Sequence, residues 1–335
     1  MRKTKVLVTR LIPQAGLDLL RETCDLEINP VDRPLARAEL LAGVADKEGV
    51  LGQMVDRIDA EFFEAARVLK GYANYAVGFD NIDVAEATRR RIPVSNTPGV
   101  LTLATAEAAW ALLFAVARRI VETDKIMRSG TWPGWAPMQF HGQEVTGKTL
   151  GILGAGRIGA AMALMSKGFQ MRVLYTITSG RENQTLKTEL GARLVSFDEL
   201  VAESDFISIH TPLTPATRHL FRAETFARMK PTAILINAAR GPVVKEDDLV
   251  AALQERRIAG AGLDVYEFEP RMAEGLASLD NAVLLPHIGS ATASSRTGMA
   301  KLAARNLLAM LKGEKPENCL NPEIYDEKGG LGNNQ

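Results

Sequence analysis

The chain has 335 residues, of which 46% are hydrophobic, and 40 Lys and Arg balance 40 Asp and Glu. This length suits two domains of ordinary size, and zero net charge gives no electrostatic reason to expect a nucleic-acid or membrane partner. Cys24 and Cys319 lie far apart with no metal-ligand spacing, so neither a metal site nor a structural disulfide is expected. No apolar run has the length of a signal peptide or a membrane span, and we expect a cytoplasmic protein.

The first hundred residues alternate short β-rich apolar runs with amphipathic helical patterns. The stretch "PQAGLDLLRET", for example, begins with Pro and has apolar residues at helical spacing. The strands expected here are residues 5–9, 25–28, 49–52, 69–73 and 92–96.

Residues 101–128 predict one long helix of roughly 40 Å at about 1.5 Å per residue. That length could cross between two domains, and the wide apolar surface indicates burial on more than one side.

The second half alternates continuous apolar runs with helical patterns, which is typical of parallel sheets covered on both faces. The strands expected here are residues 149–154, 172–176, 206–211, 233–238, 260–265 and 282–287. A last helical stretch follows residue 287, so we expect the chain to return to the first domain. The predicted fold is α/β, with two doubly wound parallel-sheet domains.

The segment "GKTLGILGAGRIGAAMA" contains Gly154-x-Gly156-x-x-Gly159 after a strand and before a helix. Two glycines let the backbone turn and approach a pyrophosphate, and the third lets the helix pack on the strand. The helix N-terminus offers unpaired N–H groups to the phosphates. A dinucleotide site is favoured over a glycine-rich turn without a ligand.

The next strand bears on which dinucleotide binds. NAD sites usually carry Asp or Glu at its end to bind the ribose 2′-OH, but here Tyr175 to Arg181 include no carboxylate. Thr178 and Ser179 could donate hydrogen bonds to a 2′-phosphate and Arg181 could pair with it. NADP is therefore the preferred expectation, and NAD remains the alternative.

Polar side chains collect where the later strands end. Arg240 follows one strand, Asp264 and Glu269 follow the next, and His287 follows the last. Because ligands bind beyond the carboxyl ends of such strands, these groups are expected at one edge of the sheet. Arg can hold a carboxylate and polarise a carbonyl, and His beside a carboxylate can move a proton. Each alone could be a surface charge or a strand-end histidine, but together beside a dinucleotide motif they favour hydride-transfer chemistry on 2-oxo acids.

The motifs "GILGAGRIG", "INAARG", "GAGLDVYEFEP" and "PHIGSAT", in this order, resemble the D-2-hydroxyacid dehydrogenase family. "ANYAVGFDNID", "NTPGVLT" and "RSGTWPGW" extend the resemblance, over nearly the whole chain, towards the glyoxylate/hydroxypyruvate reductase branch. The resemblance implies a Rossmann-like cofactor domain (100–288), a flavodoxin-like substrate domain (1–99 plus 289–335) with a cleft between them, and a homodimer whose interface includes the long helix.

Residue roles follow from the same resemblance. Catalytic roles fall on Arg240, Glu269 and His287, while Met54, Val77 and Gly78 would join Arg240 in binding the substrate. Cofactor contacts are expected from Thr105, Gly154, Ala155, Gly156, Arg157, Ile158, Gly159, Thr178, Ser179, Arg181, Thr211, Pro212, Thr217, Ala238, Asp264 and Gly289.

Four comparisons with relatives refine this interpretation: the first two concern the cofactor, and the last two argue against phosphite and formate as substrates. NAD-using relatives carry Asp where this chain has Ile177, and NADP-using reductases tend to place an Arg sooner than Arg181. Phosphite-oxidising relatives carry Lys in place of Val77, and formate dehydrogenases carry Gln in place of Glu269.

The expected reaction is therefore NAD(P)H-dependent reduction of a small 2-oxo acid such as glyoxylate or hydroxypyruvate. The alternatives are a dehydrogenase for another D-2-hydroxy acid and a dinucleotide-sensing protein like a transcriptional corepressor. The dinucleotide-sensing alternative is less favoured, because the sequence shows no obvious long interaction tail or basic patch.

Overall fold

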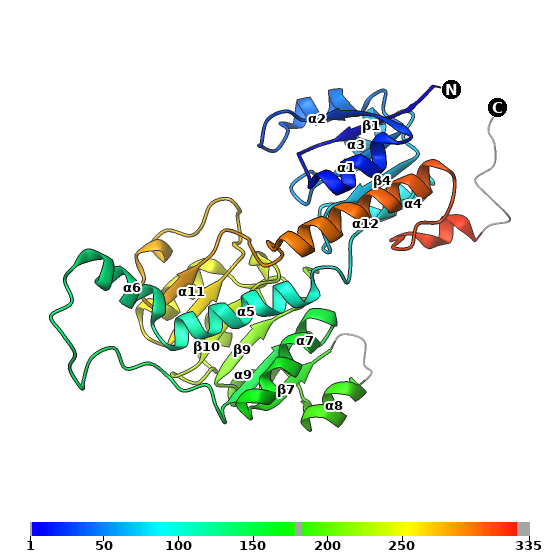
Figure 1. Ribbon diagram of the computed structural model, residues 1–335. Coiled ribbons are helices and arrows are strands. Elements are labelled where there is room, and N and C mark those ends of the chain that lie inside the picture. Colours follow the sequence, from blue (N-terminus) through cyan, green and yellow to red (C-terminus); the bar gives the residue numbers. More distant parts are fainter. Residues whose placement is uncertain (1, 178–181, 327–335) are drawn as a thin grey trace. The chain divides into compact units, whose positions relative to one another are not determined.

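A computed structural model of the chain (Figure 1) describes residues 2–177 and 182–326. The chain divides into two compact units, residues 1–101 with 292–335 and residues 102–291. Within the described ranges, no helix combines the length and apolarity needed to cross a membrane.

In the first unit, the described residues form a five-stranded, all-parallel sheet of order β2-β1-β3-β4-β5. This is the 2-1-3-4-5 order of flavodoxin-like sheets. Its strands are β1 (Thr4–Val8), β2 (Cys24–Ile28), β3 (Gly49–Gly52), β4 (Gly71–Asn74) and β5 (Val94–Ser95). Its helices are α1 (Gln14–Arg21), α2 (Arg37–Val44), α3 (Ala60–Ala65), α4 (Val84–Arg89), α12 (Ala293–Leu311) and the 3-10 turn η4 (Pro322–Tyr325).

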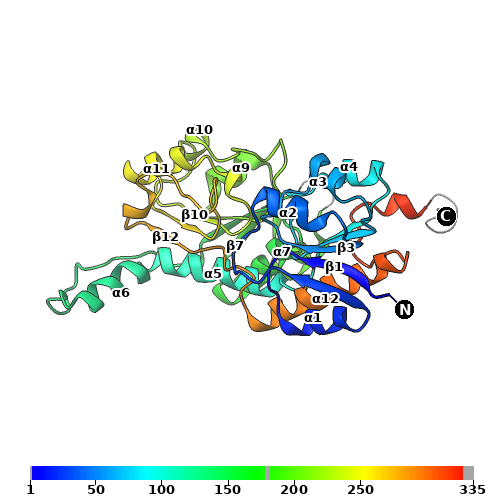
Figure 2. The ribbon, with the colours of Figure 1, turned by 90° about the horizontal axis from the view of Figure 1, so that it is seen from above.

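Helix α12 comes from the far end of the chain and packs on α1 and on β3 and β4 (Figure 2). Gly16 of α1 permits the contact, because a Cβ there would lie 2.7 Å from the carbonyl oxygen of Ala300. The Thr292 side chain begins α12 by accepting the Ser295 N–H at 3.1 Å. The helix after residue 287 thus belongs to the first unit's core.

In the second unit, the described residues form a seven-stranded parallel sheet of order β12-β11-β10-β9-β6-β7-β8. Reading β6 as the first strand gives the doubly wound 3-2-1-4-5-6 order with one strand added, in which the point of reversal lies between β6 and β9. Its strands are β6 (Thr149–Leu153), β7 (Arg172–Thr176), β8 (Arg193–Leu194), β9 (Phe206–Ile209), β10 (Ile234–Asn237), β11 (Gly260–Leu263) and β12 (Ala282–Leu284). Its helices are α5 (Thr102–Ala117), α6 (Ile120–Ser129), α7 (Arg157–Met165), α8 (Gln184–Leu190), α9 (Phe197–Glu203), α10 (Ala223–Phe226), α11 (Glu246–Gln254), and the 3-10 turns η1 (Ser166–Phe169), η2 (Gly241–Val243) and η3 (Leu276–Ser278).

The predicted fold class is confirmed, and so is each predicted strand to within a few residues. Residues of β6, β9, β10 and β11 are buried throughout, as continuous apolar strands in a parallel sheet require. Strand β8 is not among the predicted strands, because this edge strand of two exposed residues carries no apolar pattern.

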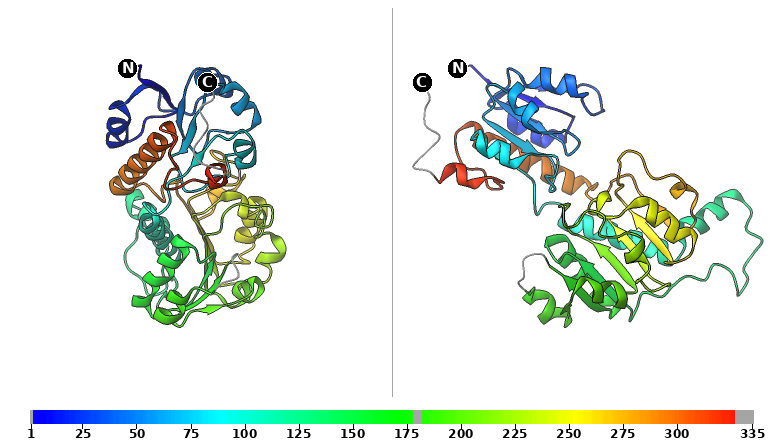
Figure 3. Two further views of the ribbon diagram at one scale, coloured as in Figure 1. Left: turned by 90° about the vertical axis from the view of Figure 1, so that its right-hand side faces the viewer. Right: turned by 180° about the vertical axis from the view of Figure 1, so that it is seen from behind.

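The prediction of one helix over residues 101–128 is wrong. Helix α5 ends at Ala117 and α6 starts at Ile120, because Arg119 between them adopts a left-handed conformation with φ of 54°. The backbone N–H of Gln143 binds the Ala117 carbonyl at 2.7 Å and closes the end of α5. Figure 3 shows α6 and the chain after it leading away from the second unit's sheet.

Helix α5 is buried on more than one side, as its composition indicates. Leu112 packs close to Gly262 of β11, and the Trp110 indole N–H donates to the Met162 carbonyl of α7 at 3.1 Å. This packing places Thr105, near the start of α5, beside Gly289.

Candidate active site

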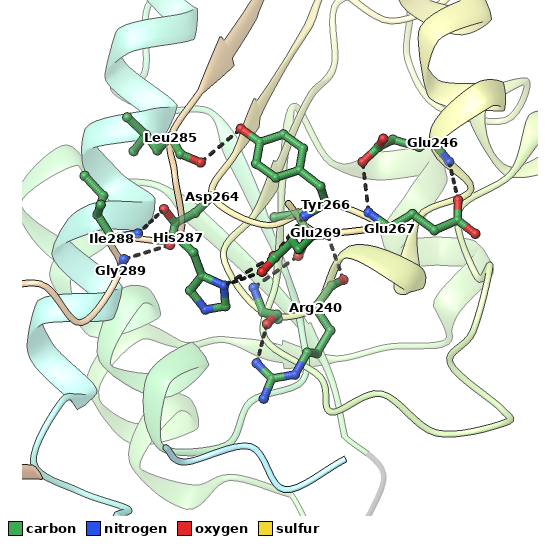
Figure 4. A network of polar contacts seen from close by, with 12 residues as sticks. Arg240, Glu246, Asp264, Tyr266, Glu267, Glu269, Leu285, His287, Ile288 and Gly289 are labelled. Carbon is green, nitrogen blue, oxygen red and sulfur yellow. Dashed lines mark hydrogen bonds and ion pairs between the residues drawn. The ribbon is translucent and has the colours of Figure 1, made fainter. Parts of the chain in front are cut away.

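The site is built at the carboxyl ends of β10, β11 and β12 (Figure 4). Nδ1 of His287 lies 3.0 Å from Oε2 and 3.2 Å from Oε1 of Glu269. A carboxylate is an acceptor, so Nδ1 carries the proton and Nε2 is left facing away from Glu269. Both side chains are about one-third exposed, which leaves the pair open to a ligand.

Glu269 is fixed from two directions. Its Oε1 also accepts the backbone N–H of Tyr266 at 3.1 Å, and the Tyr266 hydroxyl donates to the Leu285 carbonyl at 2.9 Å. Tyr266 therefore ties the loop of Glu269 to the strand that leads to His287. Burial opposes ionisation of Glu269, but the His287 contact, with help from Arg240, holds the pKa of Glu269 below its ordinary value.

The turn at His287 has φ of 56°, in the left-handed region that side chains seldom adopt. Asp264, 1% exposed, stabilises this turn by accepting the N–H groups of Ile288 and Gly289, each at 2.7 Å. Burial raises the pKa of Asp264 despite these two bonds. Gly289 is needed here, since a Cβ would lie 2.9 Å from Oδ2 of Asp264.

Arg240 is carried to the same place by the loop after β10. Asn237 is buried, donates to the Arg240 carbonyl at 2.9 Å and accepts the Ala239 N–H at 3.1 Å. A Cβ on Gly241 would lie 1.8 Å from the Tyr266 carbonyl oxygen, so only glycine lets the two loops approach this closely. Arg240, Glu269, His287 and Asp264 are thus gathered at one edge, as strand order alone predicts.

The glycine turn between β6 and α7 fits a dinucleotide. Gly154 has φ of 95°, and a Cβ on Gly159 would lie 2.2 Å from the Gly154 carbonyl oxygen. A Cβ on Gly156 would meet nothing within 4 Å, so open space lies before the start of α7. A pyrophosphate could occupy that space against the unpaired N–H groups of the helix N-terminus.

Ala155 lies in the same glycine turn, and Arg157 and Ile158 begin α7. Thr211, Pro212, Thr217 and Ala238 lie on neighbouring loops of the second unit. Thr211 is buried after β9, and the Thr217 hydroxyl donates to the Pro212 carbonyl at 2.7 Å, which closes the loop between them. Ala238 follows β10. Thr178, Ser179 and Arg181 lie outside the described residues.

The predicted substrate-binding residues of the first unit follow β3 and β4. Met54 comes after β3, and Val77 and Gly78 come after β4. The Asn96 side-chain amide donates to the Val77 carbonyl at 2.7 Å, and that of Asn74 donates to the Gly78 carbonyl at 2.9 Å. These two asparagines are not among the predicted site residues. Their one sequence signal is position, since Asn74 ends β4 and Asn96 directly follows β5.

Residues 110–289 match the profile of the family described as D-isomer specific 2-hydroxyacid dehydrogenase, NAD binding domain. The chain is 51% identical over 328 residues to a glyoxylate reductase of Thermococcus onnurineus, covering 97% of this chain and 98% of that one. The chain belongs to the D-isomer specific 2-hydroxyacid dehydrogenase family. A glyoxylate reductase of Pyrococcus furiosus is similar at 50% identity, covering 96% of both chains.

A solved NADPH-dependent glyoxylate/hydroxypyruvate reductase of Sinorhizobium meliloti, in complex with NADP and malonate, also resembles this dehydrogenase. Its TM-score is 0.84 at 31% identity, with 95% of this chain and 97% of that chain covered. The protein is therefore an oxidoreductase of this family that uses a nicotinamide dinucleotide.

Proposed function

We propose that this dehydrogenase reduces a small 2-oxo acid, glyoxylate or hydroxypyruvate, to the 2-hydroxy acid, with NADPH as the preferred reductant. The observation that carries the proposal is the His287–Glu269 contact of 3.0 Å beside Arg240, at the carboxyl ends of adjacent strands. The named activities of the relatives support the same substrate class.

The residues of the second unit divide the chemistry among them. His287 donates a proton to the substrate oxygen as the carbonyl becomes a hydroxyl, and Glu269 stabilises the positive ring before that transfer. Arg240 binds the substrate carboxylate and draws electron density from the carbonyl. Gly154 to Gly159, with Thr105, Thr211, Thr217 and Ala238, would hold the dinucleotide, which when bound supplies the hydride to the carbonyl carbon.

In this proposal a substrate domain of residues 1–99 with 289–335 contributes the substrate-binding loop, and a cofactor domain of residues 100–288 binds the dinucleotide. The N–H groups of Val77 and Gly78 bind the carboxylate, and Met54 lines the pocket. Asn96 and Asn74 hold the two carbonyls of that loop, so its N–H groups are presented in a fixed direction.

The NADP preference rests on the end of β7. The strand ends at Thr176 and is followed by Ile177, which packs against an apolar cluster and offers no carboxylate to a ribose hydroxyl. The absence of a carboxylate at this position removes the group that would repel a 2′-phosphate in an NAD site. Thr178, Ser179 and Arg181 are the residues we assign to that phosphate.

We also propose that the enzyme is a homodimer. Helix α6 has no buried residue among those described, and Trp135 and Met138 in the chain after it are each 81% exposed. Ile120, Met127 and Trp132 in the same segment are exposed as well, and a concentration of exposed apolar side chains marks an association surface. Light scattering should give twice the chain mass for the wild type and the single mass for a Trp135→Ser/Met138→Ser variant.

A cytoplasmic location stays a prediction, supported by two free cysteines, Cys24 and Cys319. Absence of a nucleic-acid partner likewise rests on the neutral net charge.

Steady-state kinetics test the function directly. Glyoxylate, hydroxypyruvate and pyruvate are each assayed with NADPH and with NADH. We expect the highest kcat/KM with NADPH and one of the first two acids. Oxidation of neither cofactor with any of the three would overturn the proposal.

A further inference from the structure

The loop of residues 267–273 presents Glu269 to His287, and it has little packing of its own. Phe268 and Met272 are 58% and 44% exposed, and Arg271 donates its N–H to the Phe268 carbonyl at 2.9 Å to close a tight turn. A turn without an apolar core takes its orientation from the points where its two ends are attached.

Both ends are attached to one side chain. Glu246, at the start of α11 and 3% exposed, accepts the Glu267 N–H on Oε1 at 3.0 Å and the Ala273 N–H on Oε2 at 2.5 Å. Figure 4 shows Glu246 and Glu267 paired on the side of the network away from His287. One carboxylate therefore spans the whole loop that carries Glu269.

The hydrogen bond between the Glu267 N–H and the Glu246 carboxylate is matched by one in the opposite direction. Oε2 of Glu267 accepts the Glu246 N–H at 3.1 Å, and Oε1 of Glu267 lies 2.5 Å from Nε2 of His219. Hydrogen bonds between backbone N–H groups and a buried carboxylate are strong, and they fix direction as well as distance.

We propose that Glu246 is a positioning residue for the reaction, which holds both ends of the loop 267–273 and thereby sets Glu269 against His287. The inference rests on the proposed function of that pair. Glu246 reaches neither partner directly, so its effect must pass through Glu269.

Glu246→Gln is the informative variant, because glutamine keeps the size but offers a donor to one of the two N–H groups. Burial raises the pKa of Glu246, so the neutral amide removes a desolvation cost that the carboxylate bears, and the fold should accept it. We expect kcat to fall roughly ten- to a hundredfold, the effect of a small misplacement of a reacting group. Asp247→Asn, which removes the same charge from an exposed position in the same helical turn, should leave kcat unchanged.

A double-mutant cycle separates positioning from general damage. If Glu246 acts through Glu269, then adding Glu246→Gln to Glu269→Gln should change kcat by less than about twofold, since coupled residues are not additive. An equal loss in both backgrounds would overturn the proposal. The cofactor dissociation constant should stay the same in every variant.

A second measurement needs no turnover. The ¹⁵N shift of His287 Nδ1 reports its hydrogen bond to Glu269, and it should move in Glu246→Gln but not in Asp247→Asn. If the ¹⁵N shift does not move in Glu246→Gln, the inference is contradicted, whether or not the enzyme reduces a 2-oxo acid. If the wild type reduces no 2-oxo acid, only the proposed function is overturned. Should Glu246→Gln fail to fold, Glu246→Asp replaces it, because aspartate keeps the charge but is too short to reach both ends of the loop. A moved ¹⁵N shift then supports the inference, and an unmoved shift contradicts it.

Discussion

Oδ2 of Asp264 accepts the backbone N–H of Gly289 at 2.7 Å, two residues beyond His287. With the second bond from Ile288, it holds a left-handed turn that determines where the imidazole projects. The position of the proposed acid–base residue therefore depends on a buried carboxylate in the preceding loop.

Asp264→Asn should reduce both stability and turnover. Asparagine can accept only one of the two N–H groups well, and a hydrogen bond to a charged group contributes about 1.5–3 kcal/mol. Relief of carboxylate burial offsets part of that loss. We expect denaturant unfolding to show a smaller free energy and kcat to drop, while Asp280→Asn, exposed before β12, behaves as wild type. A wild-type kcat in Asp264→Asn would show that the turn held by Asp264 does not position His287 for the reaction.

Asn96→Asp should weaken binding of the 2-oxo acid specifically. The substitution turns the donor facing the Val77 carbonyl into an acceptor, so the loop must shift. A lost bond plus an unsatisfied carbonyl costs about 1–3 kcal/mol, which is roughly tenfold or more in KM for the acid. KM for NADPH should not change. Asn281→Asp is the control, since it also removes an amide that donates to backbone carbonyls, but in the second unit. It should change neither the KM for the acid nor the KM for NADPH.

Ile177→Asp should move cofactor preference from NADPH towards NADH. A carboxylate at the end of β7 would repel a 2′-phosphate and could bind the ribose hydroxyls. At effective protein dielectric this repulsion is on the order of 2 kcal/mol, which predicts a change of more than about tenfold in the ratio of the two kcat/KM values. Ile177→Asn is the uncharged control. If both variants shift the ratio equally, charge is not the cause.

His210 gives a pH dependence of stability. Its ring lies between Ser208 and Met162 at the end of β9, and burial lowers its pKa from 6.5 to about 4. Between those values the unfolded chain binds a proton that the native protein does not, so stability decreases as the pH falls from 6.5 towards 4. The loss from this group at pH 5 is at most about 2 kcal/mol, because pH 5 lies about 1.5 units below the unfolded pKa and each unit corresponds to about 1.4 kcal/mol.

Urea unfolding at pH 7.5 and pH 5 measures that loss. His210→Gln should show a smaller decrease than the wild type, whereas the exposed His141→Gln should show the same decrease as the wild type. Identical pH dependence in all three proteins would mean that His210 does not titrate as described.

Much of this arrangement could be predicted from the sequence because it follows from topology. Continuous apolar runs specify parallel strands, and parallel strands deliver Arg240, Glu269 and His287 to one edge. The break at Arg119 could not be predicted in this way, since a tertiary hydrogen bond from Gln143 ends α5 inside an otherwise helical pattern. The role of Glu246 could not be predicted from the sequence either, because acidic residues are common in the first turn of a helix. Only the fold shows which N–H groups its carboxylate binds.

The most direct test of the central claim is the turnover of His287→Ala with glyoxylate and NADPH. We expect a loss of about 10²- to 10⁴-fold in kcat, the usual contribution of a general acid, with the cofactor dissociation constant unchanged and His141→Ala fully active. Wild-type kcat in His287→Ala would contradict the assignment of the proton to this residue.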